Sequence, residues 1–404
     1  MSTSLLYHGF GIRGYKYVST RYGNRSVTFT IRQDPSELCC PNCGSKKVVR
    51  RGVTWRRFRS VPIGLKPVWI SMAIQRVFCL MCSVIRQVKF GFADRRRSYT
   101  KAFERYALEL SKHMTIQDVA HHLGVSWGVI KGIQKRNLLR RFRRPKLKSL
   151  KRIAIDEISI GKGHRYLTIV LDLNTGAVVF VGDGKGAESL LPFWKRLNAS
   201  RAEIEAVAID MSPAYISAVI GHLPKAAIVF DHFHIVKLFN EKLSDLRRKL
   251  YHYVSTKMEK AVLKGTRWLL LKNPENLDDK KDETQRLQDA LEINQPLATA
   301  YYMKEDLRQF WAMRDKVTAE AFLDDWARRA RVSKIPILSK FANTLMAYRT
   351  GILAYYDYPI STGPLEGTNN KIKTMKRQAY GFRDMEFFKL KIMAIHESKY
   401  ALIG

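Results

Sequence analysis

The sequence predicts an α/β core with an all-helical insertion, preceded by a small β-rich domain with paired cysteines and a helix-turn-helix domain. Three observations predict this class. Strand-length apolar runs recur between residues 153 and 230, a long helical and basic stretch follows over 235–350, and every cysteine lies within 39–82. With 404 residues, of which 46% are hydrophobic, the chain is globular and long enough for two or three domains.

The net charge is +35, far more than solubility requires. Residues 1–150 contain 31 lysines and arginines against six acidic residues, so most of the excess lies in the first third of the chain. An excess of this size indicates a polyanionic partner, and nucleic acid is the commonest one. Binding by phosphate neutralisation would weaken as salt rises.

Two cysteine pairs have the spacing of a zinc site. Cys40-Pro-Asn-Cys43 and Cys79-Leu-Met-Cys82 are CxxC turns, each of which points two thiolates at one ion. Without an apparent secretory signal, such a cluster indicates metal binding more than disulfides. We expect one structural Zn²⁺ on these four residues, because four cysteines leave no open position for catalysis. Cys39 is the spare, and a register in which it replaces Cys40 stays open, as do reduced, unligated cysteines.

The polypeptide around these cysteines is expected to be β-rich and to resemble a zinc ribbon. Residues 27–31 alternate like a short strand, and 68–74 have the pattern of another. The first 37 residues are rich in tyrosine, glycine and arginine. The sequence assigns them no role.

A helix-turn-helix is predicted after the cysteine-bearing region. Apolar residues recur at helical spacing over 100–113, and a helix pair is expected over 115–134. Thr115 and Ser126 can cap the two helices of the pair, and Gly124 lies at the turn between them.

Residues from 151 onward have the pattern of a five-stranded sheet. Strands are expected at 153–156, 166–172, 177–181, 206–210 and 226–230, with helices after the third and fourth. Three antiparallel strands, a helix, a strand, a helix and a strand is the order of an RNase H-like sheet. We therefore expect an RNase H-like α/β core, with the helical insertion placed before a last helix that begins near residue 361.

These changes of pattern give the expected domain boundaries. They are a basic segment at 1–37, the zinc-binding domain at 38–98, the helix-turn-helix domain at 99–140, a basic linker at 141–151, the first part of the core at 152–236, the helical insertion at 237–355, and the C-terminal helices of the core at 356–404.

Three carboxylates are the candidate catalytic residues. Asp156 and Asp210 each end an apolar strand of the expected sheet, and Glu366 opens the last helix. Carboxylate oxygens suit Mg²⁺ or Mn²⁺. Two such ions about 4 Å apart can activate a water or a 3′-hydroxyl and stabilise the leaving oxygen of an in-line displacement. The ordinary alternatives are a turn residue for each aspartate and a solvated helix face for the glutamate.

Nearby acidic residues are weaker candidates as ligands. Asp172 and Asp183 adjoin turns, and Glu157 is out of register with Asp156. Other polar residues are expected to support the carboxylates or to position substrate. They are Asp231 and His234, directly after the fifth strand, and Asn370, which shares a helix face with Glu366.

Ser126 and the basic residues of three segments are the candidate DNA contacts. They are Ser126, Lys131 and Lys135 with the second helix of the pair, Arg140, Arg141, Arg143 and Arg144 at the linker, and Lys373, Lys376 and Arg377 on the last helix.

Together the motifs resemble bacterial insertion-sequence transposases of the ISL-three family. The matching segments are the two cysteine pairs, the helix-turn-helix, Asp156-Glu, Asp210-Met-Ser-Pro-Ala-Tyr, Asp231-His-Phe-His, Glu366-Gly-Thr-Asn-Asn-Lys-Ile-Lys and Lys376-Arg-Gln-Ala-Tyr-Gly-Phe, within residues 38–395. The resemblance implies an Asp-Asp-Glu triad at Asp156, Asp210 and Glu366, a divalent metal, a helical insertion, and terminal-inverted-repeat DNA as substrate.

The expected function is therefore transposition, in which the protein binds the inverted repeats of an insertion sequence, cleaves the strands and joins their 3′-OH ends to target DNA. Two alternatives stay open: an RNase H-like DNA nuclease that does not join strands, and a catalytically silent, transposase-derived DNA-binding regulator. Because two DNA ends must act together, we expect a homodimer. With no apolar run of about 18 residues and no apolar leader, we expect no membrane span and a cytoplasmic, nucleoid-associated location.

Overall fold

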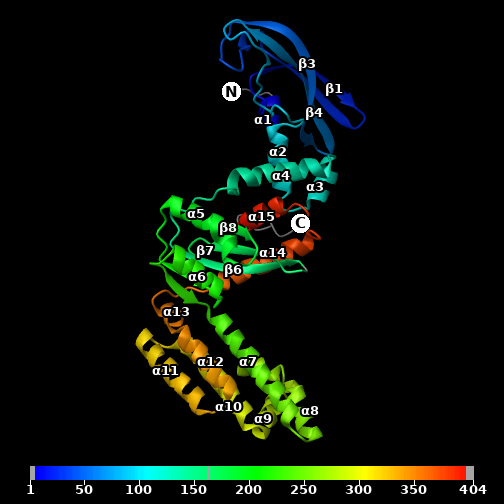
Figure 1. The fold of residues 1–404 in the computed structure, drawn as a ribbon. Helices are drawn as coiled ribbons and strands as arrows, with labels where there is room; N and C mark the ends of the chain where they lie inside the picture. The colour runs from blue at the N-terminus through cyan, green and yellow to red at the C-terminus, as the bar shows by residue number, and fades with distance from the viewer. Residues whose placement is uncertain (1–4, 162, 397–404) are drawn as a thin grey trace. The chain divides into compact units, whose positions relative to one another are not determined.

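The computed structural model describes residues 5–161 and 163–396, and the chain divides into two compact units. The first unit comprises Met1–Arg144 with Thr374–Gly404, and the second comprises Pro145–Lys373 (Figure 1). Among the described residues, no helix is both long enough and apolar enough to cross a membrane.

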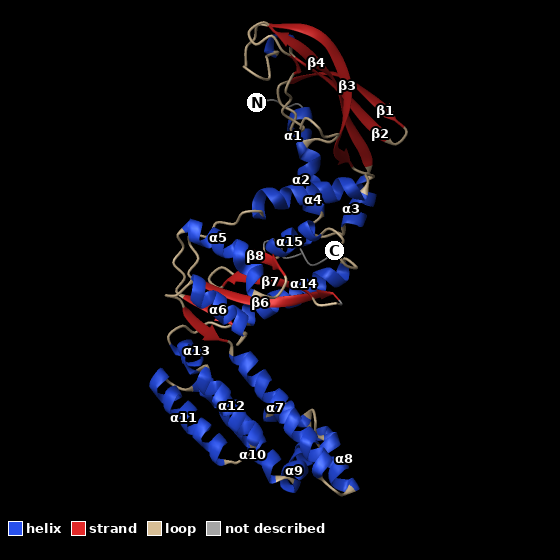
Figure 2. Cartoon of the chain, viewed as in Figure 1, coloured by secondary structure: helices blue, strands red, loops and turns tan. Residues whose placement is uncertain are grey.

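The first unit contains a five-stranded sheet (Figure 2). Its strands are β1 (Tyr15–Gly23), β2 (Ser26–Gln33), β3 (Val48–Ile63), β4 (Lys66–Cys79) and β5 (Ile85–Gln87). The order is β1-β2-β4-β3, with β5 paired to β4. The β2–β4 pair is parallel, and the β1–β2, β3–β4 and β4–β5 pairs are antiparallel.

The N-terminal segment takes part in this sheet. Val27, Phe29 and Ile31 of β2 alternate into the same hydrophobic core as β4, and the short helix α1 (Leu5–Phe10) adds Leu6 and Phe10. The sequence set residues 1–37 apart as a basic segment. The structure differs because the alternation of β2 continues the apolar face of β4.

The helix-turn-helix of the first unit has α2 (Lys101–Leu110), α3 (Ile116–Leu123) and α4 (Trp127–Phe142). The Thr115 side chain accepts a hydrogen bond from the Asp118 N–H at 3.1 Å and so caps α3, while Gly124 ends α3 at φ +61°. Ser126 occupies the cap position of α4 but makes no side-chain cap hydrogen bond.

The last helix of the described chain, α15 (Met385–Met393), packs against α4. Leu138 of α4 shares a small apolar cluster with Phe387, Leu390 and Ala394. We expected residues 356–404 to hold the C-terminal helices of the core. In the structure, the apolar side of α15 packs on the helix-turn-helix, a pairing between distant segments that helical periodicity alone does not reveal.

The second unit is built on a five-stranded mixed sheet. Its strands are β6 (Arg152–Gly161), β7 (Arg165–Asp172), β8 (Val178–Asp183), β9 (Ala206–Ile209) and β10 (Ala227–Phe230), with α5 (Leu191–Ser200) and α6 (Pro213–His222) between them. The order is β10-β9-β6-β7-β8. The β6–β7 and β7–β8 pairs are antiparallel, and β9 is parallel to β10 and to β6. This confirms the expected RNase H-like arrangement.

The expected position of Asp156 within its strand is corrected. The sequence placed it at a strand end, because the apolar run stops at Ile155. In the structure β6 continues to Gly161, and Asp156 is paired with Ile169 in mid-strand. The extension forms because Glu157 and Ile158 find partners on β7.

Helices follow β10, as expected. They are α7 (His232–Tyr253), α8 (Lys257–Gly265), α9 (Glu283–Ile293), α10 (Gln295–Arg308), α11 (Lys316–Val332), α12 (Pro336–Ala347) and α13 (Arg349–Leu353). Phe239, Trp326 and Phe341 pack at the centre of this insertion, and the Trp326 indole N–H donates to the Met303 carbonyl at 2.9 Å. The chain then enters α14 (Gly363–Gln378).

Candidate active site and cysteine cluster

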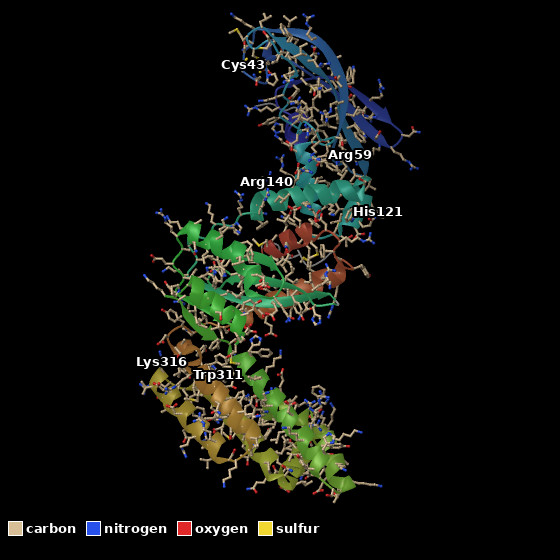
Figure 3. The ribbon with its side chains drawn as sticks, viewed as in Figure 1. Cys43, Arg59, His121, Arg140, Trp311 and Lys316 are labelled. Atoms are coloured by element: carbon tan, nitrogen blue, oxygen red, sulfur yellow. The ribbon has the colours of Figure 1, made fainter. Side chains whose placement is uncertain are left out.

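The cysteine cluster lies in the first unit, where Cys43 is labelled in Figure 3. The sulfurs of Cys40, Cys43, Cys79 and Cys82 all lie within 4.8 Å of one another. The Sγ–Sγ distances are 3.6 Å for Cys40–Cys82, 3.5 Å for Cys43–Cys79 and 3.8 Å for Cys43–Cys82. A tetrahedron with zinc–sulfur bonds of about 2.3 Å has edges of about 3.8 Å, so these residues fit a structural zinc ion. Cys39 is exposed and stands outside the cluster.

Backbone hydrogen bonds shape the two turns in the same way. Gly44 N–H donates to the Cys40 carbonyl at 2.9 Å, and Ser83 N–H donates to the Cys79 carbonyl at 2.9 Å. Gly44 and Ser83 both have positive φ, at 76° and 51°. The N–H groups of Cys43 and Asn42 lower the pKa of Cys40 to about 6, against the effect of burial, whereas burial and the neighbouring thiol of Cys79 raise the pKa of Cys82.

Asp156 is the best-defined carboxylate of the second unit. Its Oδ1 accepts the Glu157 N–H at 2.8 Å, and its Oδ2 accepts the side-chain amide of Asn369 on α14 at 2.8 Å. Burial, together with the nearby charges of Glu157 and Asp210, raises the pKa of Asp156 to about 6, although the Glu157 N–H and His234 oppose this. The Asp156 carboxylate therefore connects β6 to α14, and the charges of Glu157 and Asp210 act on it.

Asp210 directly follows β9 and accepts the Ser212 N–H at 3.0 Å, just before α6 begins. Its charge acts on both Asp156 and Glu157. Burial and Asp210 raise the pKa of Glu157, although its contact with the Tyr215 hydroxyl opposes them. Glu157, a weaker candidate than Asp156 from the sequence, therefore acts on the ionisation of Asp156 and is itself affected by the charge of Asp210.

Asp231 connects the end of β10 to the start of α14. It is buried, and its Oδ2 accepts the Thr362 hydroxyl at 2.6 Å. His234 Nδ1 lies 3.5 Å from the same oxygen, and this contact raises the pKa of His234 above its usual value, with smaller contributions from Asp156 and Asp210. Burial pushes the pKa of Asp231 upward, but His234 and Thr362 outweigh it and hold that pKa low.

Glu366 lies in the first turn of α14 and is exposed. Within the described residues, the cysteines are the only set of three or more candidate ligand atoms close enough to share one ion. The carboxylates of Asp156, Asp210 and Glu366 therefore do not form such a set.

Sequence reasoning missed Asn369. It favoured Asn370, four residues after Glu366, but Asn370 is exposed and Asn369 is the buried residue that reaches Asp156. The available signal was the buried stripe of α14, on which Leu365, Asn369 and Ile372 lie at helical spacing.

The residues around Asp156 fit a divalent cation by their chemistry. Burial raises the pKa of both Asp156 and Glu157, and the charge of Asp210 adds to this effect at each of them. The Oδ1 atom of Asn369 is buried and has no hydrogen-bond partner among the described residues. A hard cation would offset the repulsion, and oxygen ligands are the ones it prefers.

The candidate DNA contacts differ in their surroundings. Lys131 and Lys135 of α4 form ion pairs with Asp384 at 3.0 and 3.1 Å, and Lys135 also pairs with Glu386 at 2.6 Å. Other candidates are exposed: Arg140, Arg141, Arg143, Arg144, Lys373 and Arg377. Lys376 is half-buried.

Comparison with known proteins gives matches along almost the whole chain. Residues 153–392 match the family model of ISL3 described as transposase, residues 88–136 match the helix-turn-helix domain of transposase family ISL3, and residues 37–82 match the zinc-finger of transposase IS204/IS1001/IS1096/IS1165.

Similar proteins of known name include two transposases. The chain is 32% identical to the transposase for insertion sequence element IS1001 of Bordetella parapertussis, over 96% of this chain and 95% of that protein. It is 28% identical to the transposase for IS1557 of Mycobacterium tuberculosis, over 85% of this chain and 82% of that protein. Among solved structures, the Drosophila P element transposase strand transfer complex is similar over 76% of this chain and 94% of that chain, with a TM-score of 0.39 and 10% identity.

The zinc ribbon, the helix-turn-helix and the RNase H-like core, in this order, define a DNA-binding transposase. The chain belongs to the ISL3 family, the ISL-three family that its motifs resemble.

Proposed function

We propose that the protein binds the terminal inverted repeats of an insertion sequence, cleaves DNA strands there and joins the 3′-OH ends to target DNA. One observation carries the proposal. Asp156 in β6 and Asp210 after β9 are close enough for each to act on the ionisation of the site, and α14, which bears Glu366, is anchored to Asp156 through Asn369.

In this proposal Asp156, Asp210 and Glu366 hold Mg²⁺ or Mn²⁺, and two ions there would activate the attacking oxygen and stabilise the leaving one. Two contacts position α14: Asn369 with Asp156, and Thr362 with Asp231. Because Asp231 also contacts His234, a change at this residue would disturb both the helix and the imidazole. Asp231, His234 and Asn369 are therefore positioning residues, and Asn370 stays a candidate substrate contact.

The remaining parts of the proposal concern binding. Cys40, Cys43, Cys79 and Cys82 hold one structural Zn²⁺, which keeps the first-unit sheet folded. The exposed arginines at 140–144 and the basic residues Lys373, Lys376 and Arg377 contact phosphates. Ser126, Lys131 and Lys135 act from α4, where the two lysines must exchange Asp384 and Glu386 for DNA. A homodimer would bring two ends together.

The experiment is an incubation of supercoiled plasmid carrying the element's two ends with the full chain and Mg²⁺. Wild-type protein is expected to yield cleaved and joined products, and Asp156→Asn is expected to bind the ends without cutting. Glu292→Gln, which changes an exposed carboxylate on α9, is the matched control and should act like wild type.

Each other result would point elsewhere. Cleavage without joined product would identify a nuclease, and binding without cleavage by the wild type would identify a regulator. Cutting by Asp156→Asn would overturn the assignment of the site.

A further inference from the structure

One side of the first-unit sheet packs on a core and the other does not. Along β4 the residues Val68, Ile70, Met72 and Ile74 are fully buried. Because successive strand residues point to opposite sides, Trp69, Ser71, Ala73 and Gln75 face the other side, where they are half-buried.

Residues that face this outer side are paired across β1, β2, β4 and β3, and two such rows of paired residues cross the sheet. Trp69 is paired with Thr28 of β2 and Arg59 of β3, and Thr28 is paired with Arg21 of β1. In the next row, Ser71 is paired with Thr30 and Arg57, and Thr30 is paired with Ser19.

These rows combine cations, hydroxyls and aromatic rings. The Arg57 guanidinium lies 4.8 Å from the centre of the Trp69 ring, which holds it over the sheet. Trp55, paired with Ala73 on the same side, is 63% exposed. Arg32 follows Ile31 of β2 and so belongs to this side as well. Arg59 is excluded, because it is buried and donates to the Leu123 carbonyl at 2.8 Å; it is labelled in Figure 3.

The outer side has an unbalanced positive charge. Asp34 and Glu37 are the acidic residues that precede Asp94 in the sequence, and both come after β2 ends. Asp34 is held by Lys16 at 2.7 Å. In the described part of the chain, Arg21, Arg32 and Arg57 form no ion pair, and all three are exposed.

We propose that this outer sheet face, defined by Arg21, Arg32, Trp55, Arg57 and Trp69, binds the phosphate backbone of duplex DNA, in addition to the helix-turn-helix and the linker. Arginine matches phosphate through paired N–H donors, and threonine or serine hydroxyls are common phosphate contacts. Strands β1 and β3 are three strand spacings apart, or about 14 Å. Their arginines can therefore reach the two backbones that border a major groove about 12 Å wide. The inference rests on the proposed function, since it assumes that DNA is the substrate.

The test measures binding of the full chain to element-end DNA by fluorescence anisotropy over a range of salt concentrations. Each lost phosphate contact lowers the slope of log Kd against log salt by about 0.9. The triple variant Arg21→Gln/Arg32→Gln/Arg57→Gln is expected to lower the slope by about 2 to 3 units.

The matched control is Arg13→Gln/Arg25→Gln/Arg86→Gln, which removes the same charge from exposed arginines that are not among the residues defining the outer sheet face. It is expected to change the slope by less than about 1 unit. Arg21→Gln/Arg32→Gln leaves the Arg57–Trp69 stack intact, guards against misfolding of the triple variant, and should lower the slope by about 1.8.

Equal slopes for the double variant and wild type would overturn the sheet-face proposal while leaving the transposase proposal standing. Failure of the wild type to bind element-end DNA at all would overturn the transposase proposal instead.

Discussion

The cysteine cluster and the carboxylate site are two candidate metal sites whose side chains are assembled to different degrees. The four cysteine sulfurs lie within 4.8 Å of one another. In the second unit, the charge of Asp210 acts on Asp156, but Glu366 is exposed at the start of α14. Among the described residues, no three carboxylates lie close enough to share one ion.

The difference follows from what holds each set. A backbone hydrogen bond closes the turn of each cysteine pair, and this turn brings the two sulfurs of the pair together. The candidate carboxylates come from three separate elements, and burial with the charges of Glu157 and Asp210 raises the pKa of Asp156. A closed set suits a structural ion, and an open one suits ions that bind together with substrate phosphates.

The largest expected effect is on the closed set. Cys79→Ser should lower the zinc content from about one ion per chain to near zero and unfold the first-unit sheet, since structural zinc contributes on the order of 10 kcal/mol to folding. Zinc analysis and circular dichroism measure this. Cys39→Ser is the control, and its loss of zinc would show that the register of the pair had been assigned wrongly.

Glu366→Gln should have the next largest effect. We expect Glu366 to join the site when metal and DNA bind. Loss of a residue that only supports a metal ligand lowers activity by up to roughly 100-fold, so loss of Glu366 itself should lower plasmid cleavage by more than that. End binding should be unchanged, as measured by anisotropy. Glu292→Gln, which changes the exposed carboxylate on α9, is the matched control. Normal cleavage by Glu366→Gln would remove this residue from the triad.

Asn369→Ala should lower cleavage by about 10- to 100-fold, because α14 would lose its anchor on Asp156. Asn370→Ala changes the exposed neighbour and should have a smaller effect on turnover. A Mg²⁺ titration of the cleavage rate separates the two, since the first variant should need more metal. The reverse ranking would favour the original sequence prediction.

The smallest effect concerns pH. The pKa of Asp156 is about 6 in the folded protein and near 3.8 in the unfolded chain, so the protonated carboxyl stabilises the fold. This stabilisation is fully present below pH 3.8 and is lost as pH rises through about 6. In magnesium-free buffer, Asp156→Asn should therefore gain about 1–2 kcal/mol of unfolding free energy relative to wild type between pH 5 and pH 8. Urea denaturation at the two pH values measures it. An equal difference at both would mean that Asp156 ionises normally.

The sequence predicted the local features and missed the long-range ones. The CxxC pairs, the capped helix-turn-helix and the apolar strands are encoded by neighbouring residues, so their spacing was informative. Asp156 was placed at a strand end because the apolar run stops at Ile155. The second half of β6 is polar and is held in the sheet by its pairing with β7, which the local pattern does not show. Nothing in α4 itself shows that Asp384 and Glu386 cover Lys131 and Lys135.

The most direct test asks whether Glu366 joins Asp156 and Asp210 around one metal site when DNA is bound. Fe²⁺ can replace Mg²⁺ in the DNA-bound protein, and peroxide then generates radicals that cut the polypeptide next to the bound ion. We predict cuts near Asp156, Asp210 and Glu366 together, which Asp156→Asn abolishes. Cuts near Asp156 and Asp210 alone, with α14 untouched around Glu366, would contradict the proposed triad.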